Sequence, residues 1–206
     1  YGVDSKNFQK DFEYLWDAFC HTEDLWSKNM QQISKVKYIL IAEAPLYGEK
    51  RSYIYNPQSS GTAFLGISTV KKILGLLDQQ VTINNKYEML SNMREMGLMV
   101  LDLFPFAFND NTTYQYRGLS KSIRTLLAQS CSNWFLRPKL KEIFDKSDEN
   151  LTFGVRYTRL YSFTPKIIKA SSPEGFFPNI ELLGLKSFLY FLFILLFNLT
   201  IVINSC

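Results

Sequence analysis

The sequence predicts an α/β protein whose parallel β-sheet is covered by helices on both faces. Two short, continuously apolar segments, 36–42 and 98–103, have the composition of strands that are buried on both faces. Segments in which apolar residues recur at helical spacing lie before, between and after these strands. Strands that alternate with helices are typical of a parallel sheet, because each helix returns the chain to the start of the next strand.

The composition is that of a folded protein with a sizeable core. The chain has 206 residues, of which 47% are hydrophobic and 16% aromatic, so disorder is not expected. Its formal charge of +4 is compatible with a nucleic-acid partner without requiring one. Its cysteines are widely spaced and form no CxxC motif, which argues against a zinc or iron–sulfur site. Reduced thiols predict an intracellular protein, cytoplasmic or nuclear.

A first helix is expected to begin at Asp4 or Ser5 and to end at about Cys20. The only histidine, His21, would then follow the helix end, where a surface position is the simplest interpretation and a catalytic role the less favoured one. One face of this helix is expected to pack in the core, and it carries Phe8, Phe12, Leu15, Trp16 and Phe19.

The remaining elements are bounded by glycine, proline and turn residues. Gly97 suits the position after a helix end, and Pro138 suits the first turn of a helix. Helices are therefore expected over 68–77, 85–96, 120–129 and from Pro138 onward, strands over 36–42, 98–103, 151–157 and 166–170, and a turn over 147–150.

The carboxyl terminus differs from the rest of the chain. Segment 188–203 is 16 residues without a charge, short of the roughly 20 that a membrane-spanning helix needs. It could be a buried core segment, a short membrane anchor, or an altered terminus outside the domain. We therefore expect one domain over 1–186 and an apolar tail over 187–206 whose role the sequence leaves open.

Acidic residues end the first two predicted strands. Glu43 directly follows 36–42, and Asp102 lies near the end of 98–103. Parallel neighbours would bring both carboxylates to one edge of the sheet, where ligands bind in open α/β folds.

Two loops are expected to complete this edge. In the loop after the first strand, Phe64 lies between Gly61 and Gly66, which let the backbone turn tightly and present the ring. The loop 171–175 is expected to arrive from the fourth strand. A carboxylate, an aromatic ring and a polar loop predict a small pocket for a planar polar ligand.

Two motifs resemble those of the uracil-DNA glycosylase superfamily. Segment 42–45 reads Ala-Glu-Ala-Pro and is similar to the family's Gly-Glu-Ala-Pro-Gly, while 61–66 is similar to its Gly-x-Pro-Phe-x-Gly. The resemblance continues over 100–105 and, weakly, over 171–175. It implies a three-layer α/β sandwich with a small central parallel sheet. It also implies a hydrolase that flips a damaged base out of DNA and cleaves its N-glycosidic bond.

The resemblance also implies roles for individual residues. Glu43 would orient water or stabilise the cationic transition state, and Asp102 would lie near the family's base-reading Asn. Phe64 would stack on the base. The implied catalytic residues are Glu43 and Asp102, the base-binding residues Phe64, Ala44, Pro45 and Ser172, and the DNA-binding residues Ser171, Ser172 and Pro173.

The implied partner is double- or single-stranded DNA that contains a damaged base. We expect a monomer with neither metal nor cofactor, because the cysteines that often hold an iron–sulfur cluster in the most similar branch of the family are missing. The sequence departs from the family motifs at Leu46, where the family has glycine, and at 170–173, which has no histidine. Two alternatives therefore stay open. One is a catalytically silent nucleic-acid or nucleotide binding domain of the same fold, and the other is a tail-anchored membrane protein.

Overall fold

The computed structural model describes residues 5–60, 83–106, 108–109, 118–172 and 183–184. The helix expected over 68–77 and the apolar segment 188–203 lie outside the described residues. So do two of the predicted site residues, Phe64 and Pro173.

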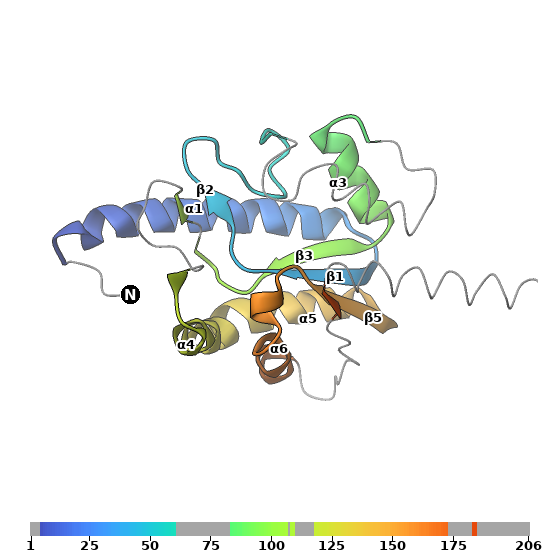
Figure 1. The fold of residues 1–206 in the computed structure, drawn as a ribbon. Coiled ribbons are helices and arrows are strands. Elements are labelled where there is room, and N and C mark those ends of the chain that lie inside the picture. Colours follow the sequence, from blue (N-terminus) through green and yellow to red (C-terminus); the bar gives the residue numbers. More distant parts are fainter. Residues whose placement is uncertain (1–4, 61–82, 107, 110–117, 173–182, 185–206) are drawn as a thin grey trace, which may run out of the picture.

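A small parallel sheet forms the centre of the fold, as the sequence predicts. Its strand order is β3-β1-β5-β6, and every neighbouring pair is parallel. In Figure 1, helices α1 and α3 lie above the sheet, and α4, α5 and α6 lie below it. The strands are β1 (Val36–Ala42), β3 (Leu98–Asp102), β5 (Ser147–Val155) and β6 (Leu183–Gly184). The helices are α1 (Ser5–Gln32), α3 (Lys86–Glu95), α4 (Lys121–Cys131), α5 (Arg137–Asp145) and α6 (Thr164–Ser171).

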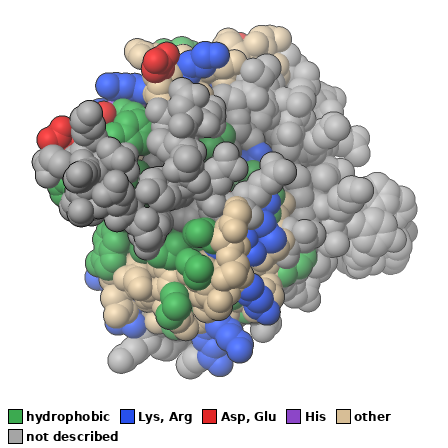
Figure 2. All heavy atoms as spheres, turned by 60° about the vertical axis from the view of Figure 1, so that its left-hand side comes forward, with side chains coloured by type: hydrophobic (Ala, Val, Ile, Leu, Met, Phe, Trp, Pro, Cys, Tyr) green, Lys and Arg blue, Asp and Glu red, His purple; other side chains and the backbone are tan. Residues whose placement is uncertain are grey.

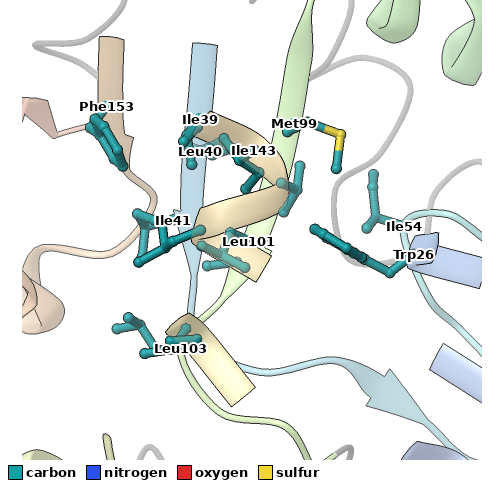
Figure 3. Close-up of a cluster of buried hydrophobic side chains, with 14 of the residues drawn as sticks. Trp26, Ile39, Leu40, Ile41, Ile54, Met99, Leu101, Leu103, Ile143 and Phe153 are labelled. Carbon is teal, nitrogen blue, oxygen red and sulfur yellow. The ribbon is translucent and has the colours of Figure 1, made fainter. Parts of the chain in front are cut away.

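The core is built on both faces of β1, because helices cover the sheet on both sides and β1 is a central strand between β3 and β5. Successive side chains of a strand point to opposite faces, yet Ile39, Leu40 and Ile41 are all fully buried. Figure 3 shows them with Trp26 from α1 and Ile143 from α5, among other buried side chains. Burial on both faces explains why the strand is continuously apolar instead of alternating.

The outer edge of β3 is closed by a tyrosine from the loop after β1. The Tyr55 hydroxyl donates to the Val100 carbonyl at 3.0 Å and accepts from the Val100 N–H at 2.6 Å. An edge strand otherwise presents backbone groups that can pair with another chain. A second, two-stranded parallel sheet joins β2 (Leu46–Tyr47), which follows soon after β1, to β4 (Phe108–Asn109).

Helices α3, α4 and α5 are confirmed close to their predicted limits, because their end signals are local. The Asn85 side chain accepts from the Glu88 N–H at the start of α3, and that of Ser120 accepts from the Ile123 N–H at the start of α4. Pro138 lies in the first turn of α5.

The predicted end of the first helix at Cys20 is wrong. Helix α1 continues to Gln32, so His21 lies within it. The added turns bury Trp26 and Met30 against the sheet. The Lys146 ammonium then caps the carboxyl end of the helix by donating to the carbonyls of Met30, Gln31 and Ile33 at 2.7–3.4 Å.

The core-facing role predicted for the aromatic face of α1 is also wrong in part. Phe12 is 48% exposed and Trp16 is 54% exposed, whereas Phe19 packs against the core. Helical spacing identified a shared face correctly, but it cannot say whether another element covers that face.

Two predictions in the last third of the chain are wrong. Residues 147–150 belong to strand β5 instead of a turn. The strand predicted over 166–170 is part of helix α6, with Pro165 in its first turn. The buried residues of α6 follow helical spacing and are Thr164, Ile167, Ile168 and Ser171.

We expect Gly97→Ala to lower the free energy of unfolding by about 2 kcal/mol. Gly97 follows α3 with φ of +74°, and an added Cβ would lie 2.7 Å from the Lys35 carbonyl oxygen. Urea unfolding followed by circular dichroism measures the loss. Gly118→Ala is the control and should change the value by less than about 0.5 kcal/mol, because an added Cβ there meets nothing within 4 Å. Equal effects of the two substitutions would contradict this account.

Candidate active site at the carboxyl edge of the sheet

Backbone pairing brings Glu43 and Asp102 to the same edge of the sheet. Ala42 pairs with Asp102 in the register of β1 and β3. The contact continues past the strands, since the Leu103 N–H donates to the Ala42 carbonyl at 3.1 Å and the Phe104 N–H donates to the Glu43 carbonyl at 2.9 Å. Both acidic residues therefore lie at the carboxyl ends of neighbouring strands, as the sequence predicts. Asp102 pairs with Ala42 and not with Glu43, and Glu43 is not among the charges that shift the pKa of Asp102.

Glu43 is buried and paired with an arginine that follows β5. The Arg159 Nε donates to Glu43 Oε1 at 3.1 Å, and Arg159 Nη2 donates to Oε2. Glu43 is only 6% exposed, and this two-point contact compensates the charge and fixes the plane of the carboxylate. The hydrogen bond with Glu43 also raises the pKa of Arg159.

The position of Arg159 follows from the sheet. β5 pairs with the other side of β1, and the Arg156 N–H donates to the Ile41 carbonyl at 2.9 Å just beyond the end of β5. The chain then enters the short 3₁₀ helix η3 (Thr158–Leu160), which carries Arg159. The Arg159 guanidinium lies over the Tyr157 ring, 4.2 Å from its centroid.

The Arg159 pairing is the part of the site that sequence reasoning missed. The sequence showed Arg159 as one of several basic residues after the third predicted strand, with no sign of its partner. The usable signal was that a carboxylate at the end of a doubly buried strand requires a cation or a proton.

Among the described residues, Asp102 forms no ion pair of this kind. It is 4% exposed, and its Oδ1 is buried without a hydrogen-bond partner among the described residues. Burial raises the pKa of its carboxyl from an ordinary 3.8 to about 7, although the charges of Lys139 and Arg156 act in the opposite direction. Near neutral pH a large share of Asp102 therefore carries a proton, and a protonated carboxyl can both donate and accept a hydrogen bond.

Two buried tyrosines share this environment. Tyr53 and Tyr55 are 3% and 2% exposed, and their rings meet edge to face with centroids 5.6 Å apart. Burial raises the pKa of both phenols, and the negative charge of Asp102 raises them further. The same burial disfavours the ionised form of all three groups, Asp102 included.

The other predicted site residues separate into two groups. Ala44 and Pro45 are buried directly after Glu43. Ser171 and Ser172 instead lie at the end of α6, where the Ser172 hydroxyl donates to the Ile168 carbonyl at 2.8 Å. The expectation that a fourth strand brings them to the sheet edge is therefore wrong. An eight-residue helix carries them about 10 Å along its axis from its first turn.

The only histidine does not extend the site. His21 lies on α1 with its ring 5.8 Å from that of Tyr47, and burial lowers its pKa. Across the described part of the chain, no group of three or more His, Cys, Asp or Glu side chains could hold a metal ion. Within the same residues, no helix is both long and apolar enough to cross a bilayer.

Two helices on the lower side of the sheet, α4 and α6, carry exposed lysines. In Figure 1 the arrow of β3 points left, with α6 below its tip and α4 lower and farther left, and neither of these helices contains Asp or Glu. Lys121 on α4 and both Lys166 and Lys169 on α6 are exposed. On the face in Figure 2, blue Lys and Arg side chains lie in the lower half without red ones beside them, while blue and red side chains occur together in the upper half.

No protein-family model, curated protein or solved structure matches the chain.

We expect the free energy of unfolding to fall as the pH rises from about 4 to about 7, and to level off above that range. In this window the folded protein keeps the Asp102 proton that the unfolded chain has lost, so unfolding releases a proton and is favoured by higher pH. Asp102→Asn should remove this part of the pH dependence. Urea unfolding at several pH values measures it, with the exposed Asp145→Asn as control. An unchanged slope in Asp102→Asn would refute a buried, protonated Asp102.

Proposed function

We propose that this protein is a uracil-DNA glycosylase-like base-excision hydrolase that cleaves the N-glycosidic bond of a flipped base. One observation carries the proposal: two acidic residues end neighbouring parallel strands, and one of them, Glu43, is held in place by an arginine. The motif that contains Glu43 resembles the first motif of that superfamily. The α/β fold with its small parallel sheet and flanking helices agrees with this family and with many others.

Glu43 is suited to stabilise positive charge on a sugar. When the bond from C1′ to the base nitrogen breaks, the electron pair leaves with the base and the sugar becomes oxocarbenium-like. A nearby carboxylate lowers the free energy of that state. Water then adds to C1′, and its proton is taken up by the departed base or by solvent. Because Arg159 fixes the Glu43 carboxylate, little reorganisation is needed during the reaction.

Asp102 is suited to read the edge of the base. An ionised carboxylate only accepts hydrogen bonds, but a carboxyl with a pKa of about 7 also occurs in its protonated form near neutral pH. That form offers a donor and an acceptor side by side, as an amide does. It therefore matches a base that presents neighbouring carbonyl and N–H groups.

The basic helices α4 and α6 are suited to contact the DNA backbone. Their exposed lysines form a surface without carboxylates from these two helices, and such surfaces supply the salt-dependent part of DNA affinity. Lys166 and Lys169 are the most useful probes, because both are exposed on α6.

A second candidate function is a silent DNA- or nucleotide-binding domain. Arg159 engages both oxygens of Glu43, which leaves this carboxylate less able to act on a substrate. The lone histidine lies on α1 and contacts Tyr47. The third possibility, a tail-anchored membrane protein, depends on segment 188–203 and stays a prediction.

We expect Glu43→Gln to lower glycosylase activity by at least about 100-fold, because the amide cannot supply negative charge beside the sugar. The assay uses the full chain and labelled single- and double-stranded oligonucleotides that carry uracil, hypoxanthine or xanthine, with alkali to cut abasic sites. Glu49→Gln, an exposed carboxylate change in the following loop, should keep full activity. Circular dichroism establishes that each variant is folded.

The same proteins separate the two candidate functions. If folded wild-type protein cleaves none of these substrates but binds the oligonucleotides, the hydrolase proposal is wrong and the silent binder is favoured. If neither cleavage nor binding occurs, both are wrong.

We expect the double variant Lys166→Gln, Lys169→Gln to bind DNA more weakly and with a smaller salt dependence. Each lost phosphate contact should reduce the slope of log K against log salt by roughly 1. Fluorescence anisotropy at several salt concentrations measures the slope. Lys37→Gln is a matched control, because Lys37 is exposed at the opposite, amino end of β1. Equal slopes for all three proteins would exclude α6 from the DNA interface.

A further inference from the structure

An aromatic surface on α1 is left partly exposed by the fold. The rings of Phe12 and Trp16 stack with centroids 6.3 Å apart, and Trp16 lies 5.7 Å from Phe19. Phe19 in turn contacts Trp134, whose side chain is 50% exposed, at 6.1 Å. We call Phe12, Trp16, Phe19 and Trp134 the aromatic face. Clustered exposed aromatics of this size commonly mark an interaction surface.

A cavity of about 400 Å³ opens beside the aromatic face, between α1 and α5. Its aromatic lining comes from Phe19, Trp26, Trp134 and Phe135. Its charged lining comes from Glu23, Asp24, Glu142 and Lys139, so carboxylates outnumber ammonium groups.

The cavity wall already accommodates a cation. The Lys139 ammonium lies 3.7 Å from the centroid of Trp26 and 5.0 Å from that of Phe135, and it pairs with Glu23 at 2.8 Å. Lys139 is almost completely buried. Aromatic rings and a carboxylate together thus hold an ammonium group out of water at this site.

The backbone between α4 and α5 is unusual at the same place. Residues Ser132–Leu136 form a π-helical segment, η2, which carries both Trp134 and Phe135 into the cavity lining. π-helical turns are rare and occur frequently at functional sites. The two rings lie 5.9 Å apart.

The charge of α1 indicates the kind of partner. Residues 12–32 contain four carboxylates and one lysine, although the whole chain has a net charge of +4. Glu23 pairs with Lys139 and Asp24 with Lys28, so among the described residues Glu142 is the carboxylate of the cavity lining that forms no ion pair. An acidic, aromatic surface repels phosphate and attracts basic groups. This surface therefore suits a basic protein segment and not a nucleic acid.

We propose that the aromatic face and its cavity bind a basic segment of a partner protein, in which a Lys or Arg lies next to an aromatic or aliphatic anchor. The anchor packs on Trp16 and Trp134, and the cation enters the cavity toward Glu142. The aromatic face adjoins the segment after β3, since Phe106 lies 6.0 Å from Phe19 and 6.2 Å from Trp134, but this interaction does not depend on the proposed hydrolase activity.

The test uses the full chain and a ten-residue peptide in which a Leu-Phe pair is flanked by two Arg and two Lys. A peptide with Glu in place of all four basic residues is the charge control. We expect the basic peptide to bind, as measured by calorimetry, and the acidic peptide not to bind. Trp134→Ala should weaken binding about tenfold, and Glu142→Gln should weaken it about threefold. Tyr87→Ala should leave it unchanged, since Tyr87 is an exposed ring on α3, away from the cavity lining.

Several outcomes would overturn the proposal. The proposal is wrong if the basic peptide does not bind, or if Trp134→Ala does not affect its binding. If a single-stranded oligonucleotide binds instead and binds more weakly to Trp134→Ala, the aromatic face is a nucleic-acid site. If size-exclusion chromatography reveals a dimer that is lost in Trp134→Ala, the aromatic face binds a second copy of this chain.

Discussion

The rest of the structure depends on the parallel pairing of β1 with strands on both of its sides. β3 and β5 take up its backbone hydrogen bonds, and helices cover the two faces of the sheet, so Ile39, Leu40 and Ile41 are fully buried. The same register fixes which residues emerge at the carboxyl edge. Glu43, Asp102 and the segment that leads to Arg159 meet there because the three strands that carry them are neighbours.

Glu43 and Asp102 both lie where water is largely excluded, but the groups around them differ. Glu43 receives a two-point contact from Arg159, which compensates its charge. Asp102 has no such contact among the described residues, and burial raises its pKa to about 7, so it is charged or neutral according to pH. Carboxyls that lie at one edge of a sheet in different environments can serve different chemical roles, which is why this edge is the best candidate for an active site.

The charges of the described surface are also divided between its sides. Helices α4 and α6 carry lysines without carboxylates, while residues 12–32 of α1 are acidic and present exposed aromatic rings. A nucleic acid would favour the first surface, and a basic protein segment would favour the second. The two surfaces adjoin at η2, which directly follows α4 and carries Trp134.

The sequence by itself determined the elements whose signals are local. The apolar runs that end at Ala42 and Asp102 are strands, Asn85 and Ser120 cap helices, and Gly97 adopts the positive φ that its place after α3 requires. It also placed Glu43 and Asp102 at one edge, because parallel neighbours share a direction. The resemblance to uracil-DNA glycosylases stays a prediction.

Only the tertiary structure decided the features that depend on residues far apart in the chain. Helix α1 continues past Cys20 because Trp26 and Met30 find partners in the sheet, and Phe12 and Trp16 are exposed because no described element covers them fully. Arg159 reaches Glu43 only because β5 lies beside β1. Burial and pairing of this kind are set by the packing of whole elements, which the spacing of residues within one segment cannot reveal.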